Sequence, residues 1–345
     1  MNAASPGGPR APAADAPAIA VVGAGSWGTA LAVQLARSGR QVRLWGRDAV
    51  QLRAAAADRE NRRYLPGVPL AGNIRVDEEL ADAIEGAGDI LLAVPSRGLR
   101  ETITKLQPLM HGGERICWAT KGFELTTGKL PHEVVRELLG DDHAVAVLSG
   151  PTFAREVAEG LPTALTIAAS DETFASDLAR ALSGPNFRAY TSSDIAGVEV
   201  GGAVKNVLAI GAGISDGLGF GANARIALIN RGLAEMIRLG VALGAKQDTF
   251  VGLAGMGDLV LTCTDDQSRN RRFGLALASG QTVEEAEAGI HQVVEGVRAA
   301  KAVHQVSTRL GVEMPICEQV YRILYEGVAP RDAVEALMNR ELKAE

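Results

Sequence analysis

The sequence has few residues of the types that build small secreted domains or nucleic-acid-binding surfaces. Only three cysteines occur among 345 residues, Cys117, Cys263 and Cys317, and their wide spacing fits neither a disulfide framework nor a metal site. This pattern predicts a reduced protein of the cytoplasm. Aromatic residues make up 4% of the chain, which argues against the stacking platforms that bind single-stranded nucleic acids.

Positive charge is also scarce. The 35 lysines and arginines are outnumbered by 41 acidic residues, so the formal net charge is −6. Such a chain lacks the broad positive field that nucleic acids and anionic membranes attract, and no nucleic-acid partner is expected. Any anionic ligand must therefore meet a local cluster of basic residues. The five histidines show no HExxH or comparable spacing, so no metal is expected either.

No hydrophobic run has the form of a signal peptide or a membrane span. Residues 16–36 carry no charge, but Gly23, Gly25, Ser26 and Gln34 interrupt them, and no basic segment precedes them. We therefore expect no membrane insertion. The first 17 residues are rich in alanine and proline, which predicts a disordered tail over 1–17.

The residues that are present describe a folded protein of about two domains. Hydrophobic residues make up 47% of the chain and charged residues 22%, as in globular proteins with large cores. The length of 345 residues corresponds to about two typical domains. Glycine, with 40 residues, exceeds its usual share of about 7%, which indicates many tight turns and places where backbone approaches a ligand closely.

From residue 18 onward, short apolar runs alternate with segments of helical periodicity. This alternation predicts an α/β fold, a Rossmann-type doubly wound, mostly parallel sheet with helices on both faces. The expected strands are 18–22, 41–45, 89–94, 115–119, 144–148, 163–168 and 187–190. The expected helices between them are 26–38, 48–58, 96–107, 127–139 and 171–183.

The strand signal stops near residue 193. Beyond it the pattern is helical, with expected helices that include 224–243, 282–309 and 315–326. The sequence therefore predicts two domains after the tail: a dinucleotide-binding domain over 18–198 and an all-helical, substrate-binding domain over 199–345.

A glycine motif follows the first predicted strand and opens the first predicted helix. In Gly23-Ala-Gly25-Ser-Trp-Gly28, the first glycine permits a tight turn, the second lets backbone approach a pyrophosphate, and the third lets helix and strand pack closely. The unpaired N–H groups of the helix start then face the phosphates. The alternative is a strand-to-helix turn that binds nothing.

The end of the second predicted strand bears on the choice between NAD and NADP. A carboxylate usually stands there in NAD-selective proteins. This chain has Arg47, which can pair with the 2′-phosphate of NADP, followed by Asp48, which leaves NAD open. A solvated surface arginine is the alternative for Arg47. We expect NADPH to be used at least as well as NADH.

Two loops leave predicted strands at the edge where open α/β sheets bind ligands. Lys121 lies in Trp-Ala-Thr-Lys-Gly-Phe after the strand at 115–119, near the expected nicotinamide end of the cleft. Gly150 and Thr152 lie in Ser-Gly-Pro-Thr-Phe-Ala after the next strand, where small residues permit close approach. The alternatives are a loop lysine in water and a threonine that caps a helix.

Lys205 lies in an almost wholly apolar helical run, 201–214, in which only Lys205 and Asn206 have polar side chains. Such a helix is buried, and an isolated buried charge is costly, so the lysine must face a cleft or a partner. Desolvation lowers a lysine pKa and makes a better general base near neutral pH. A lysine that extends to the surface is the alternative.

A local anion receptor is predicted near residue 270. Arg269 lies between Ser268 and Asn270, and guanidinium groups match phosphate geometry. Arg271 and Arg272 fit a solvated helix face. Asp258, between Gly257 and Leu259, either holds a lysine or caps a helix.

Together these motifs resemble the NAD(P)-dependent glycerol-3-phosphate dehydrogenases of the bacterial type. The resemblance covers 18–340 and includes GAGSWGTALA, WATKGFE, SGPTFA, GGAVKNVLAIGAGISDGLGFGANARIALI, AGMGDLVLTCTDDQSRNRRFG and QVVEG. It implies reversible hydride transfer between NAD(P)H and dihydroxyacetone phosphate to give glycerol 3-phosphate for phospholipids in the cytoplasm.

The resemblance also implies residue roles. It makes Lys205 the proton donor and acceptor. The positions that match the substrate site are Lys121, Gly150, Thr152, Lys205, Asp258, Ser268, Arg269 and Asn270. The positions that match the cofactor site, beside the three motif glycines, are Ser26, Trp27, Arg47, Tyr64, Lys121, Ala154, Arg269, Val293 and Glu295.

Two other functions stay open from the residues alone. One is a two-domain dehydrogenase with a lysine base and a different acid substrate, such as a 2-ketoacid reductase, which the arginine cluster disfavours. The other is a regulator that senses dinucleotides without turnover, which leaves Lys205 unexplained and has no basic element for DNA. A homodimer is expected as the commonest oligomer.

Overall fold

One half of the chain is built on a single twisted sheet. The computed structural model describes residues 16–290 and 293–340, so the predicted tail 1–17 lies outside the described residues apart from Ala16 and Pro17. The strand order across the sheet is β3-β2-β1-β4-β5-β6-β7-β8. The strands are β1 (Ala18–Val22), β2 (Val42–Trp45), β3 (Ile74–Asp77), β4 (Ala87–Leu92), β5 (Arg115–Trp118), β6 (Val145–Ser149), β7 (Thr163–Ala169) and β8 (Phe187–Ser192).

The pairing confirms the predicted fold class. All neighbouring strands run parallel except β6 and β7, which pair antiparallel. The order reverses at β1, whose neighbours are β2 and β4, as in doubly wound sheets. The loops that follow β1, β4 and β5 therefore lie side by side at the carboxyl edge, where such sheets bind ligands.

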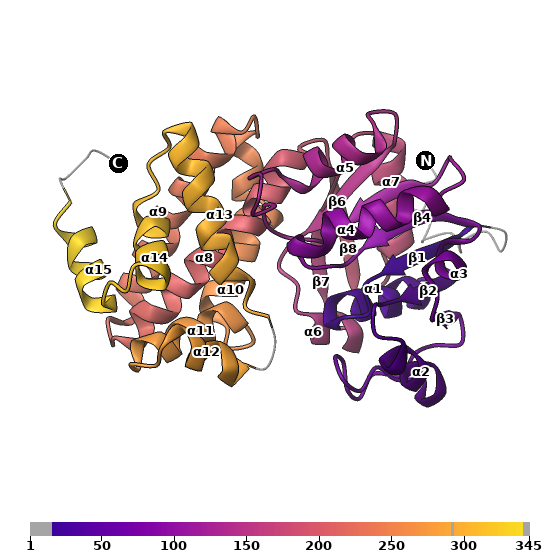
Figure 1. Ribbon diagram of the computed structural model, residues 1–345, viewed down its shortest axis with the longest axis horizontal. Coiled ribbons are helices and arrows are strands. Elements are labelled where there is room, and N and C mark those ends of the chain that lie inside the picture. The colour runs from indigo at the N-terminus through magenta and orange to yellow at the C-terminus, as the bar shows by residue number, and fades with distance from the viewer. Residues whose placement is uncertain (1–15, 291–292, 341–345) are drawn as a thin grey trace, which may run out of the picture.

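Helices cover both faces of this sheet (Figure 1). They are α1 (Ser26–Arg37), α2 (Ala49–Asp58), α3 (Leu80–Ile84), α4 (Ser96–Leu106), α5 (Pro131–Leu139), α6 (Ala154–Glu159) and α7 (Glu172–Leu182). The side chains of Asp48 and Asp171 accept hydrogen bonds from backbone N–H groups in the first turns of α2 and α7. These N-caps define where the two helices begin.

Three details differ from the predicted elements. Strand β3 was not predicted, because its four residues alternate apolar and charged side chains and contain no continuous apolar run of the kind that marks the other strands. The short helices α3 and α6 were also not predicted. The helix predicted over 127–139 begins only at Pro131, because Gly128 has φ +69° and proline favours the first helical turn.

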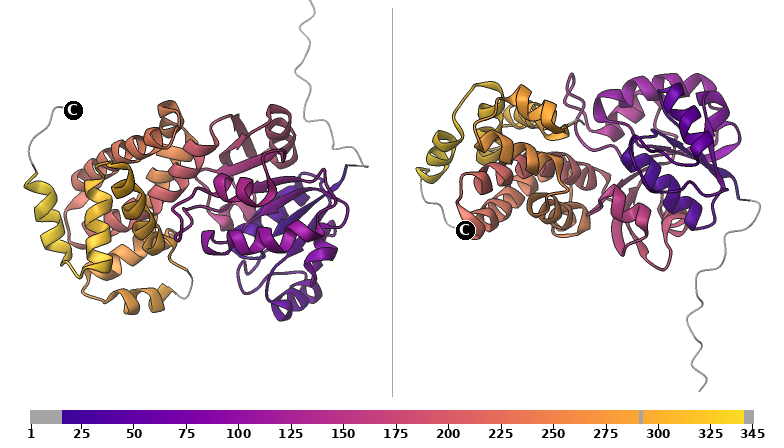
Figure 2. Two further views of the ribbon diagram at one scale, coloured as in Figure 1. Left: turned by 45° about the horizontal axis from the view of Figure 1, so that its top comes forward. Right: turned by 90° about the horizontal axis from the view of Figure 1, so that it is seen from below.

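The other half of the molecule contains only helices among its described residues. They are α8 (Ile195–Gly217), α9 (Gly221–Ala242), α10 (Asp258–Thr264), α11 (Arg269–Ala278), α12 (Val283–Ile290), α13 (Glu295–Leu310), α14 (Pro315–Tyr325) and α15 (Pro330–Met338), with short turns over 247–257. Figures 1 and 2 show these helices as a bundle beside the sheet. The predicted continuous helix over 282–309 is wrong, because Val294 is extended and caps the start of α13.

Helix α8 is the centre of this bundle. It is long and apolar enough to cross a membrane by length and composition, yet 94% of its most apolar window is buried inside the protein, as in a core helix. Ile195 and Val198 pack into the core of the sheet half, whereas Val200 and the residues after it pack into the helical core. The helix that carries Lys205 thus begins against the sheet.

Candidate active site

The glycine turn after β1 has the shape that the motif predicts. Gly23 has φ +127°, and a side chain there would collide with the backbone of Ala93. A methyl group on Gly28 would collide with the carbonyl group of Gly23. At Gly25, in contrast, a methyl group would meet no atom of residues 16–290 and 293–340 within 4 Å. The backbone is therefore packed at two of the three glycines and open at the middle one.

This open space lies at the start of α1. Gly25 is the N-cap residue of α1, and no side chain in the described part of the chain caps this end of the helix. The first N–H groups of a helix need acceptors and attract negative charge. An open, uncapped helix start beside a tight glycine turn fits the pyrophosphate of a dinucleotide.

The neighbouring cofactor candidates lie around this turn. The Ser26 hydroxyl donates to the Tyr64 carbonyl oxygen at 2.7 Å, which joins two of the predicted positions. The indole Nε1 of Trp27 is buried and has no hydrogen-bond partner among the described residues. Ala154 is the first residue of α6.

Arg47 is exposed and lines a groove between the ends of β2 and β4. The other residues of the groove include Trp45, Val94, Arg97 and Lys105. Asp48 is engaged elsewhere: one carboxylate oxygen accepts from Gln51 N at 3.1 Å, and the other pairs with Arg63 at 2.8 Å. The basic side chain of Arg47 thus faces this groove, while the adjacent carboxylate is used by α2 and Arg63.

A buried carboxylate joins two lysines from opposite halves of the molecule. The Nζ atoms of Lys121 and Lys205 each lie 2.6 Å from a different carboxylate oxygen of Asp258. Lys205 Nζ also donates to the Thr262 hydroxyl at 2.9 Å. Asp258 is 1% exposed and Lys205 is 7% exposed, so bulk water hardly reaches this cluster.

Burial sets the charge state of the cluster. It lowers the pKa of Lys205 to about 8, although Asp258 acts in the opposite direction. For Asp258, burial alone would raise the pKa, but the ammonium groups of Lys121 and Lys205 outweigh it, and the pKa is lowered. The site therefore holds an ionised carboxylate beside a lysine whose pKa of about 8 lets it gain and lose its proton close to neutral pH.

Lys121 and Ser149 both lie against Gly202 of α8. A Cβ atom on Gly202 would lie 3.2 Å from Lys121 Cγ and 3.2 Å from the Ser149 hydroxyl oxygen. The Ser149 hydroxyl is buried and has no hydrogen-bond partner in the described part of the chain. The absence of a side chain at Gly202 thus leaves room for the lysine that reaches Asp258.

The loop after β6 contains the predicted positions Gly150 and Thr152. A Cβ atom on Gly150 would lie 2.8 Å from Leu165 Cα, so only glycine fits there. The Thr152 hydroxyl donates to the Gly150 carbonyl oxygen at 3.2 Å. Thr152 is not a helix cap, because α6 begins after Phe153 and no side chain caps it.

The predicted anion receptor lies at the start of α11. Ser268 is the N-cap residue, and its hydroxyl accepts from Arg271 N at 3.2 Å. Asn270 donates to the Asn206 side-chain oxygen and accepts from Gly296 N, both at 2.9 Å. These bonds tie α11 to α8 and to the start of α13.

Arg269, the first residue of α11, lies near Glu295. Burial raises the pKa of Glu295, while the positive charges of Arg269, Lys121 and Lys205 act against that increase. Val293, two residues earlier, is partly buried. The structure thus gathers Arg269 and Glu295 around the lysine cluster.

Arg271 differs from the expectation of a solvated helix face. It is 8% exposed and pairs with Asp216 at 2.7 Å and with Asp266. The neighbouring Arg272 is exposed, as expected. Positions 271 and 272 lie about 100° apart around a helix, so Arg271 can meet Asp216 of α8 while Arg272 stays exposed.

Sequence reasoning did not single out Thr262, although it contacts Lys205. Asp258 and Thr262 are four residues apart on α10, and this spacing places both side chains on one helix face. This spacing of four residues was the sequence signal that could have identified Thr262 as a neighbour of Asp258. Among residues 16–290 and 293–340, no group of three or more His, Cys, Asp and Glu side chains is arranged to hold a metal ion.

Comparisons with known proteins agree over most of the chain. The family model described as the NAD-dependent glycerol-3-phosphate dehydrogenase N-terminus matches residues 18–175, and that of the C-terminus matches 194–335. A glycerol-3-phosphate dehydrogenase (NAD(P)+) of Tolumonas auensis is 54% identical over 329 residues, which cover 95% of this chain and 98% of the relative. The Aeromonas hydrophila protein of the same name is 54% identical over 333 residues. This match covers 96% of this chain and 100% of that relative.

Solved structures give the same result. A crystal structure of glycerol-3-phosphate dehydrogenase from Coxiella burnetii superposes with a TM-score of 0.92 at 49% identity. The match covers 94% of this chain and 99% of that one. The sheet, the helical half and their arrangement are therefore shared with this relative.

Proposed function

Because the chain belongs to the NAD-dependent glycerol-3-phosphate dehydrogenase family, we propose that it catalyses reversible hydride transfer between NAD(P)H and dihydroxyacetone phosphate, giving sn-glycerol 3-phosphate. The protein is an NAD(P)-dependent oxidoreductase of the glycerol-3-phosphate dehydrogenase type. The observation that supports the proposal most strongly is the buried contact of Lys121 and Lys205 with Asp258.

Lys205 is the proposed proton donor and acceptor. When a ketone is reduced, negative charge develops on its oxygen, and a nearby ammonium group stabilises and then protonates that oxygen. A pKa of about 8 lets Lys205 give the proton in one direction and take it in the other. Asp258 and Thr262 hold the Nζ atom in place.

The basic groups around this lysine are the proposed substrate contacts. Arg269 is suited to the phosphate of the substrate, because its guanidinium offers several N–H donors in one plane. Lys121 adds a second cation beside Lys205. The other proposed substrate contacts are Gly150, Thr152, Asp258, Ser268 and Asn270.

The glycine turn and the start of α1 are the proposed site for the dinucleotide, whose nicotinamide supplies or accepts the hydride when bound. The open space at Gly25 and the uncapped helix end support this assignment. Arg47 is the proposed contact of the 2′-phosphate of NADP. The remaining proposed contacts are Gly23, Ser26, Trp27, Gly28, Tyr64, Lys121, Ala154, Arg269, Val293 and Glu295.

The proposed division of labour follows the two halves. Residues 18–198 are the proposed cofactor domain and residues 199–345 the proposed substrate domain. We further propose that the enzyme works in the cytoplasm as a homodimer and supplies glycerol 3-phosphate for phospholipid synthesis. Light scattering during gel filtration tests the dimer.

The test of the activity is the rate of NADPH and NADH oxidation with dihydroxyacetone phosphate. We expect turnover with both cofactors, at least as fast with NADPH, and almost none with unphosphorylated dihydroxyacetone or a 2-ketoacid. A chain that reduces the 2-ketoacid but not dihydroxyacetone phosphate has a different substrate, and the proposal then fails.

A further inference from the structure

The segment that carries Lys121 belongs to the sheet half by sequence but packs on the helical half. This segment, residues 119–131, runs from the end of β5 to the first residue of α5. The side chains of Phe123 and Leu130 are buried in the helical core. At the tip of the segment, the Thr127 carbonyl oxygen accepts from Arg309 of α13 at 3.0 Å. The position of Lys121 therefore depends on how segment 119–131 is held against the helices.

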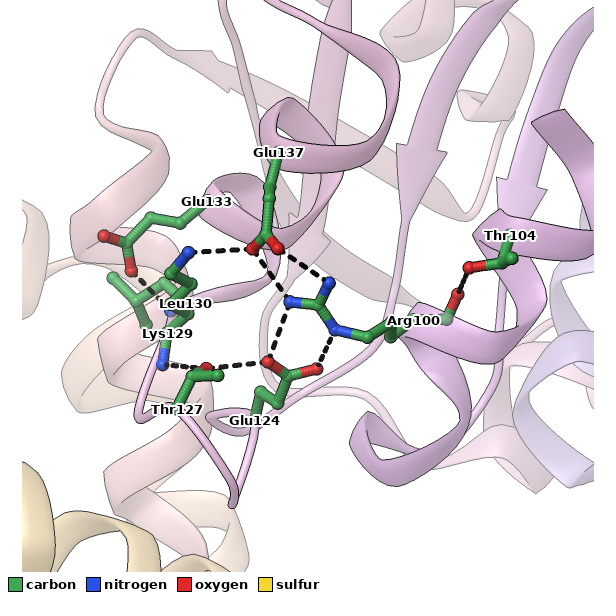
Figure 3. A network of polar contacts seen from close by, with 8 residues as sticks. All are labelled: Arg100, Thr104, Glu124, Thr127, Lys129, Leu130, Glu133 and Glu137. Atoms are coloured by element: carbon green, nitrogen blue, oxygen red, sulfur yellow. Dashed lines mark hydrogen bonds and ion pairs between the residues drawn. The ribbon is translucent and has the colours of Figure 1, made fainter.

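The solvent side of this segment is held by Arg100 of α4. Its guanidinium group donates two hydrogen bonds to Glu124, at 2.8 and 3.0 Å, and two to Glu137 of α5, at 3.0 and 2.9 Å (Figure 3). Lys129 pairs with the same Glu137 at 2.7 Å. All these contacts come from the sheet half, so they do not determine where the segment lies relative to α8.

The buried side is held by one carboxylate of α8. Glu199 is 2% exposed, accepts two N–H hydrogen bonds and makes a third hydrogen bond to a histidine ring nitrogen. Its partners are Trp118 Nε1 at 2.9 Å, His132 N at 2.9 Å and His132 Nδ1 at 2.5 Å. Trp118 immediately precedes segment 119–131 and His132 immediately follows it. A single side chain of α8 thus binds both ends of the segment.

The positions along α8 connect this carboxylate to the reaction site. Glu199, Gly202 and Lys205 follow one another at intervals of three residues, which places them along one ridge of the helix. Glu199 and Lys205 are about 9 Å apart along the helix axis. The stem of Lys121 passes over Gly202, between them, and its Nζ atom then reaches Asp258.

We propose that Glu199 is a positioning residue: it fixes both ends of segment 119–131 on α8 and thereby sets where the Lys121 ammonium group meets Asp258 and the substrate. Glu199 acts through Lys121 and touches no reacting atom. The inference rests on the proposed function for the role of Lys121, whereas the fixing of the segment is a property of the fold alone.

The first test is a double-mutant cycle with Lys121→Ala. In the native background we expect Glu199→Ala to lower kcat/KM for dihydroxyacetone phosphate about 10²-fold, mainly through KM, because small displacements of a substrate-positioning group cost that much. In the Lys121→Ala background the same change should cost less than about threefold, since the two residues act as one unit. Glu199→Gln keeps one acceptor oxygen but loses the carboxylate oxygen that faces His132 Nδ1, so it should loosen the segment in part and lower kcat/KM less than Glu199→Ala does.

The matched control is Glu235→Ala. Glu235 of α9 is also buried, at 1% exposure, and accepts the backbone N–H bonds of Ile316 and Cys317 at 2.6 and 3.1 Å, away from segment 119–131. Its removal should lower the melting temperature but reduce kcat/KM by the same factor in both backgrounds. If Glu199→Ala also acts equally in both backgrounds, or leaves kcat/KM unchanged, the positioning role is refuted.

The second test needs no activity and no cofactor. Hydrogen–deuterium exchange is measured in native protein, Glu199→Gln, Trp118→Phe and Glu235→Ala, so a failure of Glu199→Ala to fold does not remove the test. The amides of 119–131 should exchange faster in Glu199→Gln and Trp118→Phe, and at the native rate in Glu235→Ala. Unchanged exchange in the first two variants overturns the proposal, even if the enzyme reduces dihydroxyacetone phosphate. Faster exchange without turnover of that substrate instead refutes the proposed function.

Discussion

At the scale of single residues, the proposed chemistry depends on Lys205. A buried ammonium group costs free energy, and here Asp258 and Thr262 offset part of that cost through direct contacts at 2.6 and 2.9 Å. The remaining desolvation lowers the pKa to about 8. Burial therefore has two effects on Lys205: it costs free energy, and it lowers the pKa so that the ammonium group can release its proton close to neutral pH.

Replacing Lys205 by methionine tests this role. The change keeps the length and the apolar stem but removes the proton, so kcat should fall about 10²–10⁴-fold. NADPH binding, measured by its fluorescence, should persist. If the variant folds, binds NADPH and keeps kcat within a few-fold of native, Lys205 is not the proton donor and Lys121 becomes the next candidate.

Arg269 carries the prediction for substrate choice. Charge-assisted hydrogen bonds contribute about 1.5–3 kcal/mol each, so Arg269→Ala should lower kcat/KM for dihydroxyacetone phosphate more than tenfold. Arg272→Ala, which removes an exposed arginine of the same helix, is the matched control and should change little. An equal loss with unphosphorylated dihydroxyacetone would show that Arg269 does not hold the phosphate.

Arg47 carries the prediction for cofactor choice. Its side chain lines the groove after β2, while Asp48 is bound by α2 and Arg63. Arg47→Asp places a carboxylate where a 2′-phosphate would sit and should shift the kcat/KM ratio toward NADH. Arg53→Asp, on the exposed side of α2, should leave the ratio unchanged. An unaltered ratio in Arg47→Asp removes Arg47 from the cofactor site.

At the scale of elements, different glycines of the turn between β1 and α1 serve packing and ligand binding. Gly28 lets α1 approach the turn, since a methyl group there would collide with the Gly23 carbonyl group. Gly25 has no such neighbour, so its lack of a side chain serves no packing contact among the described residues. A glycine that packing does not require is best explained by a ligand.

Two alanine variants should therefore behave differently. Gly25→Ala should keep a melting temperature close to native and weaken NADPH binding, because its methyl group points into open space at the helix start. Gly28→Ala should lower the melting temperature clearly, because the strand and helix must move apart. Calorimetry and NADPH titration measure both effects. Native NADPH affinity in Gly25→Ala would contradict the proposed pyrophosphate site.

At the scale of the whole molecule, Asp258 joins the two halves. It binds Lys121 from the loop after β5 and Lys205 from α8, so the charge state of the site depends on both halves being in place. Its negative charge raises the pKa of Lys205 against burial, while the charge of Lys121 lowers it. The pH dependence of catalysis therefore reports on this contact.

Alcohol oxidation needs neutral Lys205, so its kcat/KM should rise with pH and level off above about 8, and ketone reduction should fall over the same range. Asp258→Asn removes the negative charge, so burial and Lys121 lower the lysine pKa further. Both limbs should then move to lower pH. pH profiles of kcat/KM in each direction measure the shift; a limb that stays in place, or moves to higher pH, would contradict this charge assignment.

The sequence by itself determined most of the architecture. Short apolar runs between segments of helical periodicity predicted seven of the eight strands in the described residues, and the glycine motif predicted the turn at Gly23. These features are local, because short apolar runs, helix periodicity and glycine turns are properties of a few consecutive residues. Strand β3 was not predicted because its four residues at the sheet edge include Arg and Asp and so form no apolar run.

Tertiary structure decided how the charged residues are paired. The residues next to Lys205 in the sequence do not show that it shares Asp258 with Lys121. Likewise, the residues next to Glu199 do not show that it binds Trp118 and His132. Arg271 looked solvated because its partner Asp216 lies on another helix. Such contacts join residues that are far apart in the chain, and burial then decides which charges are held and how their pKa values move. Local sequence patterns therefore determined the strands, helices and turns, whereas long-range packing determined which charged side chains meet in the site.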